Sequence, residues 1–352
     1  MEYNAAIIGL GFIGGADQIS GDALGQKVSD LDGTHFHAYE NNKKINLVAG
    51  SSRDYGRRYR FKEKCNAKTY EDWEDLIKSE KIDIVSIATY TPSHEEITVA
   101  CSEAGIKIIY CEKPAAHNLR ACKNMIDTCK KNNTLLVFNH QRRFNKNYKK
   151  LKELITQGEL GELTSINVQW GSGRLGNVGT HVLDAIFMLT PYYPKSIIGK
   201  LDTTGKLDCR GNKFRDPGGW GFIELNNNLM VTVDAGDNNV TPIEIKINGT
   251  KGRAITGDLD VSINYWDDHD SFIPRTGETV KLDINDKRSS MDLAVEEMVN
   301  YLENGTEFSY QPQEAFKVLE TIIGFYVSNK EESKIIKFPL NTDFYDILLN
   351  SG

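Results

Sequence analysis

The sequence predicts an α/β protein: an N-terminal Rossmann domain with a doubly wound parallel sheet, then an α+β domain with a large, mostly antiparallel open sheet. Its 352 residues are enough for two domains. Apolar runs alternate with helical stretches and glycine breaks up to about residue 140, and beyond it strand follows strand across short Asn/Gly turns. We therefore expect domains at residues 1–140 and 141–352.

The first predicted strand, residues 5–8, runs directly into a glycine-rich turn. Gly9, Gly11 and Gly14 have G-x-G-x-x-G spacing, with Phe12 and Ile13 between the last two. In a Rossmann fold these glycines make the tight turn, admit a pyrophosphate to the backbone and let the helix pack closely on the strand. The phosphates then lie on the N–H groups that open the next helix. The spacing predicts a dinucleotide-binding domain.

Residues 16–33 depart from a compact Rossmann unit. This segment contains three glycines and four aspartates, and it precedes a helical stretch at 34–41. An insertion of this length beside a phosphate turn is either a lid over a cofactor or substrate, or a surface decoration. The sequence leaves both possibilities open.

The second predicted strand, residues 45–50, ends in Ser51, Ser52 and Arg53. An NAD-binding Rossmann fold places Asp or Glu at this tip to accept from the ribose 2′-hydroxyl. Two hydroxyls and a guanidinium suit a 2′-phosphate instead, which favours NADP(H) over NAD(H). Two alternatives stay open: Asp54 takes the carboxylate position, or Arg53 only faces water.

The rest of the first domain continues the alternation. Lys113 follows a predicted strand and Glu112, and a lysine at that edge of a parallel sheet points into the crevice where ligands bind. Ser93 is expected to cap the helix that follows it. The predicted elements are helices at 73–77, from Ser93 to 105 and at 119–132, and strands at 82–89, 106–110 and 135–138.

The second domain shows a different pattern. Alternating runs with short polar turns predict a large sheet, and the last helix is expected to pack back on the first domain or on this sheet. The predicted strands are 163–170, 219–225, 229–235, 243–247, 253–256 and 280–284, and the predicted helices are 147–157, 180–189, 290–303 and 312–328.

Composition excludes several classes of partner. A net charge of −7 and a pI near 5.6 argue against binding to nucleic acid. The basic cluster at 57–60 is interpreted as a solvated helix face. No apolar run is long enough for a membrane span, and the N-terminus is predicted to be a strand rather than a signal peptide. The six cysteines form no C-x-x-C pair, and no histidine/acid cluster has metal spacing. We expect a cytoplasmic protein without a metal.

A second group of polar residues surrounds His181. A helix beginning at Thr180 would put His181 in its first turn and Asp184 on the same face, three residues on. Histidine can take or give the proton that accompanies hydride transfer to a carbonyl, and Lys113 would polarise the same oxygen. The alternative is structural: His181 bonds to backbone, and Asp184 pairs with an arginine.

The three motifs, Gly9-x-Gly11-x-x-Gly14, Glu112-Lys113-Pro114 and Gly179-x-His181-x-x-Asp184, resemble those of the glucose–fructose oxidoreductase / inositol dehydrogenase (Gfo/Idh/MocA) family. The resemblance covers nearly the whole chain. It implies a Rossmann domain followed by a domain whose open sheet often forms dimers or tetramers. It also implies NAD(P)-dependent oxidation or reduction of a secondary alcohol or ketone on a sugar, sugar derivative or cyclitol.

The resemblance also implies roles for single residues. Lys113 matches a lysine beside substrate and nicotinamide, and Glu112 an acid against the cofactor. His181 matches the catalytic histidine, and Asp184 an acid that contacts substrate hydroxyls. The residues that match cofactor-lining or nicotinamide-contacting segments are Thr89, Pro92, His94, Gln141 and Arg142.

Asn177 departs from the family, which usually has aspartate there. An amide can orient a hydroxyl but cannot take a proton, so a proton relay would depend on His181 and Lys113. We expect an NADP(H)-preferring homo-oligomeric dehydrogenase, with Asn177 and Asp184 positioning hydroxyls. Two alternatives are a redox-neutral, glycoside-cleaving enzyme with a retained dinucleotide, and a non-enzymatic cofactor or sugar sensor.

Overall fold

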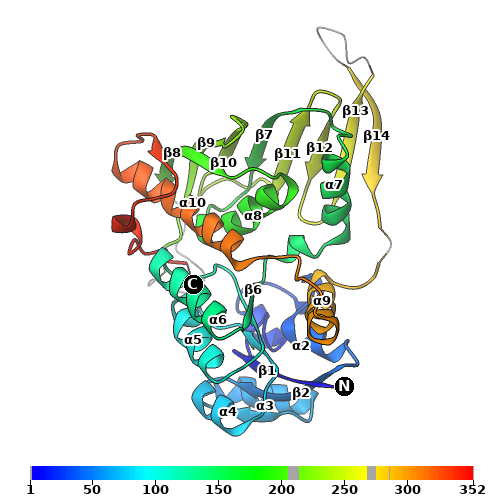
Figure 1. The fold of residues 1–352 in the computed structure, drawn as a ribbon, viewed down its shortest axis with the longest axis vertical. Coiled ribbons are helices and arrows are strands. Elements are labelled where there is room, and N and C mark those ends of the chain that lie inside the picture. Colours follow the sequence, from blue (N-terminus) through cyan, green and yellow to red (C-terminus); the bar gives the residue numbers. More distant parts are fainter. Residues whose placement is uncertain (1, 205–213, 268–274, 285, 352) are drawn as a thin grey trace. The chain divides into compact units, whose positions relative to one another are not determined.

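The computed structural model describes residues 2–204, 214–267, 275–284 and 286–351 (Figure 1). The chain forms two compact units. The first comprises Met1–Gln141 and Lys287–Phe316, and the second comprises Arg142–Asp286 and Lys317–Gly352. Residues 287–316, which fall in the second predicted domain, thus group with the N-terminal unit. The boundary also divides the long helix α10 (Pro312–Lys330).

The first unit is built on a six-stranded sheet in the order β3-β2-β1-β4-β5-β6. Every neighbouring pair is parallel. β4 and β5 are buried at every position, as expected for strands covered on both faces. The predicted Rossmann fold is confirmed. The strands are β1 Tyr3–Ile8, β2 Ile45–Ser51, β3 Lys68–Tyr70, β4 Ile84–Ile87, β5 Ile108–Cys111 and β6 Leu135–Phe138.

The helix expected after the glycine turn is split in two by the insertion. Gly11 to Gly15 form one turn, closed by a 2.9 Å bond from Gly15 N–H to Gly11 C=O. The chain leaves through residues 16–33 and returns as α2 (His35–Glu40). The N–H groups of His35 and Phe36 then bond to the carbonyls of Ile13 and Gly14, at 3.1 and 3.0 Å. These bonds join the two pieces as successive turns of a helix.

Two glycines of the turn are required by its geometry. Gly9 has φ +100°, and a Cβ on it would meet the Ala88 carbonyl oxygen at 2.4 Å. A Cβ on Gly14 would lie 1.9 Å from the Gly9 oxygen, which no adjustment of a side chain can relieve. Gly14 therefore packs against Gly9 at the start of the turn, and Gly9 packs against Ala88 just after β4.

The helices of the first unit agree broadly with the predicted ones. One prediction was wrong: Ser93 makes no side-chain cap, because Thr91–Ser93 is already a 3₁₀ turn and the Ser93 hydroxyl bonds to Thr89 and to the Tyr90 carbonyl. The helices are α1 Gln18–Asp22, a 3₁₀ turn Val28–Asp30, α3 Tyr55–Lys64, α4 Trp73–Ser79, α5 His94–Glu103, α6 Leu119–Lys131 and α9 Ser290–Asn304.

The second unit contains a nine-stranded sheet in the order β14-β13-β12-β11-β7-β10-β9-β8-β15. Only β7 and β10 pair in parallel, so the sheet is mixed and mostly antiparallel, as predicted. The strands are β7 Leu163–Gln169, β8 Pro194–Asp202, β9 Gly218–Leu225, β10 Met230–Ala235, β11 Glu244–Gly249, β12 Gly252–Thr256, β13 Val261–Trp266, β14 Thr276–Leu282 and β15 Ile336–Lys337.

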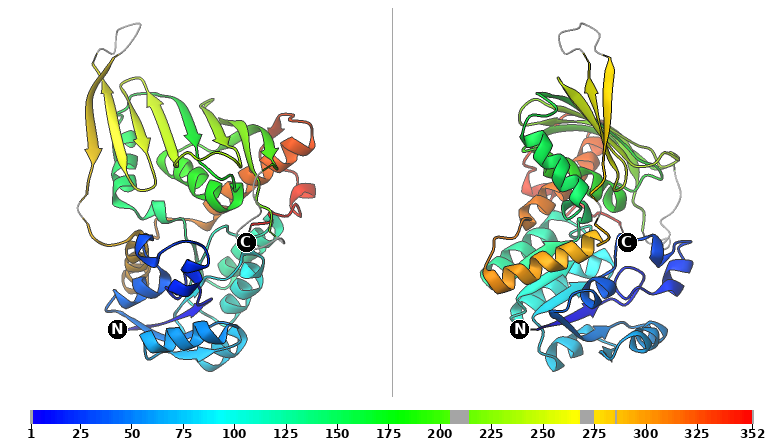
Figure 2. Two further views of the ribbon diagram at one scale, coloured as in Figure 1. Left: turned by 180° about the vertical axis from the view of Figure 1, so that it is seen from behind. Right: turned by 90° about the vertical axis from the view of Figure 1, so that its right-hand side faces the viewer.

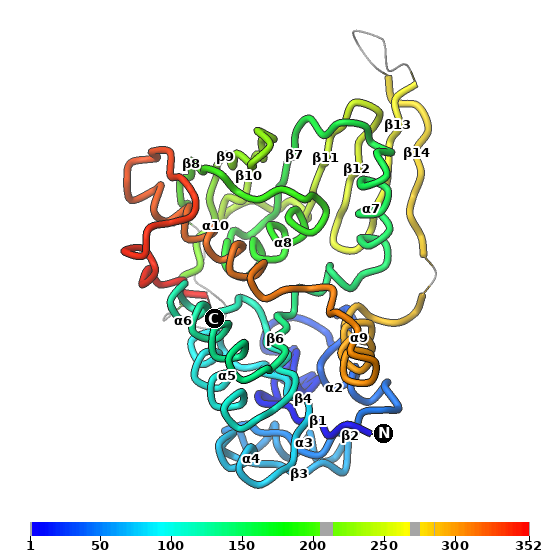
Figure 3. The backbone as a smooth tube through the Cα atoms, viewed as in Figure 1, coloured from blue at the N-terminus to red at the C-terminus, as the bar shows by residue number. Residues whose placement is uncertain are grey.

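One face of this sheet is covered by α7 (Lys146–Thr156) and α8 (Thr180–Leu189), as the side view of Figure 2 shows. α8 is buried at nine of its ten positions, since it lies in the core of the unit. A π-helical turn, Leu175–Gly179, leads directly into it. The tube in Figure 3 lets the reader follow β7 through this turn into α8.

Among the described residues, no helix is both long and apolar enough to cross a bilayer, and no group of histidine, cysteine, aspartate or glutamate could hold a metal ion. The five described cysteines are free thiols, four of them buried. Cys209 lies outside the described residues.

We predict that Gly14→Ala destabilises the protein by about 1–3 kcal/mol, because its methyl group would overlap the Gly9 oxygen. Gly11→Ala is the matched control, since a Cβ there has only the Arg57 guanidinium near it, at 3.6–3.7 Å. Urea unfolding of both variants measures the difference. Equal stabilities would contradict the close packing of this turn.

Candidate functional site

The sequence-predicted cofactor residues of the first unit follow the ends of its strands. The glycine turn follows β1, Ser51 ends β2, Thr89 comes after β4, and Glu112 comes after β5. Because all six strands are parallel, these residues lie at the same edge of the sheet. The structure thus brings these segments to one edge of the sheet.

The turn itself fits a pyrophosphate. Gly11 leaves open the space that a Cβ would fill, with the Arg57 guanidinium alone within 4 Å of it. A phosphate could therefore approach the backbone closely and meet a positive charge there. Phe12 and Ile13 lie between Gly11 and Gly14 in this turn, partly exposed.

Arg57 is held by the insertion. Its Nε donates to Ser20 Oγ at 3.0 Å, and the Ser20 hydroxyl donates to Asp17 at 2.5 Å. Arg60 pairs with both Asp17 oxygens, at 2.6 and 2.9 Å. Burial would raise the pKa of Asp17, but its bonds with Arg60 and Ser20 lower it to about 2. The interpretation of residues 57–60 as a solvated face was therefore wrong for Arg57 and Arg60, which fasten α3 to the insertion.

The tip of β2 presents a mixture of buried and exposed groups. Ser51 is buried and Arg53 is exposed. Asp54 caps α3 by accepting from the Arg57 N–H at 2.8 Å, so its carboxylate is engaged in helix capping. Arg58 donates to the carbonyls of Ser52 and Arg53, which fixes the backbone of the tip.

The end of β4 carries Thr89, Pro92 and His94. The His94 ring is fully buried, with one nitrogen 3.1 Å from the Pro114 carbonyl and the other 3.2 Å from the Thr89 carbonyl. Burial lowers its pKa, against the opposing effect of these carbonyls. His94 therefore ties the β4 end to the β5 end, and Pro92 is exposed beside it.

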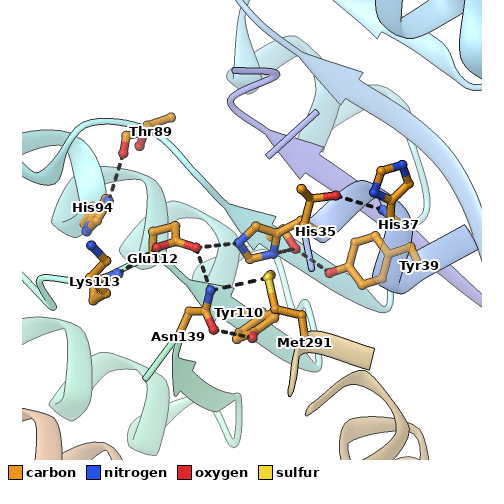
Figure 4. A network of polar contacts seen from close by, with 12 residues as sticks. His35, His37, Tyr39, Thr89, His94, Tyr110, Glu112, Lys113, Asn139 and Met291 are labelled. Atoms are coloured by element: carbon orange, nitrogen blue, oxygen red, sulfur yellow. Dashed lines mark hydrogen bonds and ion pairs between the residues drawn. The ribbon is translucent and has the colours of Figure 1, made fainter. Parts of the chain in front are cut away.

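Glu112 is the centre of a buried polar network at the end of β5 (Figure 4). Its Oε1 accepts from His35 Nε2 at 3.0 Å and from Asn139 Nδ2 at 2.7 Å. Burial would raise the pKa of Glu112, but the bond from His35, the charges of His35 and Lys113, and the bond from Asn139 outweigh it and lower the pKa to about 2. The group is therefore a buried carboxylate. Lys113, half-buried, is the next residue.

In the second unit, the predicted catalytic helix is held by an aspartate that the sequence did not single out. Asp216 accepts from the N–H of Gly176 at 2.8 Å and from the N–H of Asn177 at 2.7 Å. These bonds hold the π-helical turn from which α8 continues. His181 lies in the first turn of α8 and is partly exposed, as is Asn177.

Asp184 is fully buried and paired with Arg143. The Arg143 Nε lies 2.9 and 2.8 Å from the two carboxylate oxygens. Burial raises the pKa of Asp184 to about 6, although the charge and the hydrogen bond of Arg143 oppose the rise. The structural alternative for this residue, an arginine partner, is thus the geometry that the structure shows.

The segment after β6 contains an arginine that is buried and paired within the protein. Arg142 is 2 % exposed and pairs with Asp258 within the second unit. Gln141, the last residue of the first unit's N-terminal segment, is partly exposed. A buried and paired Arg142 has little surface to offer to a nicotinamide or substrate.

The sequence analysis missed four polar residues: His35, Arg57, Asn139 and Asp216. Asn139 had a detectable signal, because it directly follows a predicted strand at the ligand-binding edge. His35 follows the insertion, Arg57 lies on a helix face that was expected to be solvated, and Asp216 comes from a segment distant in sequence.

Comparisons with known proteins agree with the Rossmann fold of the first unit. Residues 3–140 match the model of an oxidoreductase family with an NAD-binding Rossmann fold, GFO_IDH_MocA. Myo-inositol 2-dehydrogenase of Thermotoga maritima is 38% identical over 103 residues, which cover 29% of this chain and 30% of that protein. Matches to other inositol 2-dehydrogenases also cover less than half of those proteins.

Two solved structures share the fold over nearly the whole chain. A putative NADPH-dependent oxidoreductase from Desulfitobacterium hafniense superposes with a TM-score of 0.76 at 18% identity, covering 96% of this chain and 98% of that one. An aldose–aldose oxidoreductase from Caulobacter crescentus has a TM-score of 0.75 at 18% identity, covering 96% and 100%. At this identity the likeness establishes the fold alone.

We predict a measurable effect of Glu112 on acid stability. Its pKa is about 2 in the folded protein against 4.5 for an unperturbed glutamate, so its contribution to the free energy of unfolding is complete above about pH 5 and is lost as the pH falls toward 2. The difference corresponds to about 3 kcal/mol. The free energy of unfolding, measured in urea, should therefore fall more steeply between pH 5 and pH 2 for the wild type than for Glu112→Gln. Parallel curves would contradict a buried, ionised Glu112.

Proposed function

We propose that this protein is a dehydrogenase of the Gfo/Idh/MocA family that transfers hydride between nicotinamide and a secondary alcohol or ketone, because residues 3–140 match the model of an oxidoreductase family with an NAD-binding Rossmann fold. The observation that carries the proposal is that one edge of the parallel sheet bears both an open glycine turn and Lys113. The substrate class is a sugar, sugar derivative or cyclitol, in keeping with the named inositol and aldose enzymes among the relatives.

The dinucleotide would be held by backbone and basic groups of the first unit. Gly9, Gly11 and Gly14 admit the pyrophosphate, and Arg57 faces it at Gly11. When bound, the nicotinamide supplies the hydride acceptor or donor at its C4 carbon.

Lys113 and His181 have the chemistry that the reacting oxygen needs. A Lys113 ammonium donates a hydrogen bond to that oxygen and stabilises negative charge on it. His181 takes the hydroxyl proton during oxidation and returns it during reduction. Asn177 orients a substrate hydroxyl, and Asp184 acts through Arg143 by fixing α8, rather than by touching the substrate.

We further propose NADP(H) as the preferred cofactor. Asp54, the carboxylate next to the tip of β2 in sequence, caps α3, and Arg53 is exposed beside two serines. A 2′-phosphate would gain charge-assisted hydrogen bonds from such a site.

The proposal includes a homodimer or homotetramer formed through the nine-stranded sheet. Exposed Trp220, Phe222 and Met230 on neighbouring strands β9 and β10 support it. A cytoplasmic location is also proposed, and the free thiols of the five described cysteines are compatible with it.

We predict that Lys113→Met lowers turnover about 100-fold or more, because the developing charge on the oxygen loses its donor. Dinucleotide affinity, measured by NADPH fluorescence, should change little. Lys107→Met is the control: this exposed lysine stands before the opposite end of β5 and pairs with Asp83. Turnover is assayed on a panel of cyclitols and sugars.

Normal turnover by Lys113→Met would remove this lysine from the mechanism. Tight, exchangeable NADPH binding by the wild type without turnover on any substrate would favour the sensor alternative. A dinucleotide that stays bound through many cycles of glycoside cleavage would favour the redox-neutral alternative.

We predict different cofactor effects for two arginines. Arg53→Ala should weaken NADPH more than NADH by about 1–3 kcal/mol, because a charged bond to the 2′-phosphate is lost. Arg57→Ala should weaken both, because it faces the pyrophosphate turn. Lys68→Ala, which removes an exposed cation from β3, controls for net charge. An equal effect of Arg53→Ala on both dinucleotides would contradict the 2′-phosphate assignment.

A further inference from the structure

The Glu112 network has two arms that end on the same oxygen. In the first, the Tyr39 hydroxyl lies 2.7 Å from Ser86 Oγ, and Ser86 Oγ lies 2.7 Å from His35 Nδ1. His35 Nε2 then donates to Glu112 Oε1. Tyr39, Ser86 and His35 are all at most 1 % exposed, so water does not compete for these bonds.

The second arm reaches Glu112 from Asn139, just after β6. The Tyr110 hydroxyl donates to Asn139 Oδ1 at 2.6 Å, which orients the amide so that Asn139 Nδ2 points at Glu112 Oε1. Figure 4 shows both arms meeting at the carboxylate. Two donors on Oε1 restrict the orientations that the carboxylate can take.

The remaining oxygen of Glu112 faces the next residue. The Lys113 backbone N–H lies 3.3 Å from Glu112 Oε2. His94 reaches the same segment from α5 through the Pro114 carbonyl. The backbone that carries Lys113 is therefore tied to a carboxylate that is itself held by His35 and Asn139.

From these contacts we propose that His35 and Asn139 are positioning residues for Lys113, acting through the Glu112 carboxylate. This inference rests on the proposed role of Lys113 at the reacting oxygen. Removing either donor leaves a buried carboxylate oxygen short of a bond, and the carboxylate must turn to find another partner. The Lys113 backbone then loses its anchor.

The insertion at residues 16–33 also has a role in this arrangement. The chain returns from residues 16–33 at Thr34, which caps α2, and His35 is the first residue of that helix. The insertion is fastened at its start by Asp17 and Arg60, and near its end Asp32 accepts from the Ser290 N–H at 3.0 Å. The insertion is therefore fixed at both ends, and this holds His35 at the edge of the sheet.

The test compares His35→Leu and Asn139→Leu with the conservative variant His35→Gln, whose amide can still donate to Glu112. Hydrogen–deuterium exchange of the segment 112–118 in the free protein reports the anchoring without any need for activity. We expect exchange about tenfold faster in both leucine variants and near wild type in His35→Gln. The kcat should fall about tenfold in the leucine variants while the NADPH dissociation constant changes less than threefold.

Ser102→Ala is the matched control, because it removes a buried hydroxyl that bonds Thr134 in the same unit, away from Glu112. Unchanged exchange of 112–118, or equally faster exchange in all segments, would overturn the proposal. Failure of the wild type to turn over any substrate would refute the proposed function, whereas the exchange result still decides whether His35 and Asn139 anchor Lys113.

Discussion

A carboxylate that is buried and ionised must receive hydrogen bonds from the protein, and this requirement organises the first unit around Glu112. Its two donors come from α2 and from the end of β6, and the segment it anchors follows β5. α9 adds a contact from far along the chain, since Met291 Sδ lies 3.7 Å from Asn139 Nδ2. Residues 287–316 group with this unit partly for that reason.

Buried carboxylates of the second unit also receive hydrogen bonds from the protein, but from different kinds of donor. Asp184 is buried against a full positive charge on Arg143, and Asp216 is satisfied by two backbone N–H groups. Both carboxylates act on the segment from Gly176 to Asp184, which includes His181. In each unit, then, the proposed reactive side chain stands on backbone that a buried acid holds in place.

Local patterns made much of this fold predictable. The apolar runs of β1, β4 and β5 and the G-x-G-x-x-G spacing are properties of short stretches, and the strands and turn follow them. β8 and β13 were missed, because their outward residues are polar and the inward residues are recognised only against a neighbouring strand. The motifs that contain Lys113 and His181 are likewise short stretches of sequence.

The hydrogen-bond partners of the proposed site residues could not be predicted from local patterns. Asp184 was expected to position substrate hydroxyls or to pair with an arginine, but only the fold shows that its partner is Arg143, 41 residues earlier. His35 is separated from Glu112 by 77 residues and from the glycine turn by an insertion. Contacts of this kind depend on topology, so a single sequence carries no signal for them.

The divided first helix has a consequence for how such chains are aligned and compared. Hydrogen bonds from His35 to Ile13 and from Phe36 to Gly14 make the helix continuous in space, although eighteen residues (16–33) separate its halves in sequence. An alignment that closes this gap keeps the helix in register, and Thr34 then stands in the place of the residue after the glycine turn. His35 then stands two residues after the glycine turn in this continuous helix, and from there it reaches Glu112 after β5.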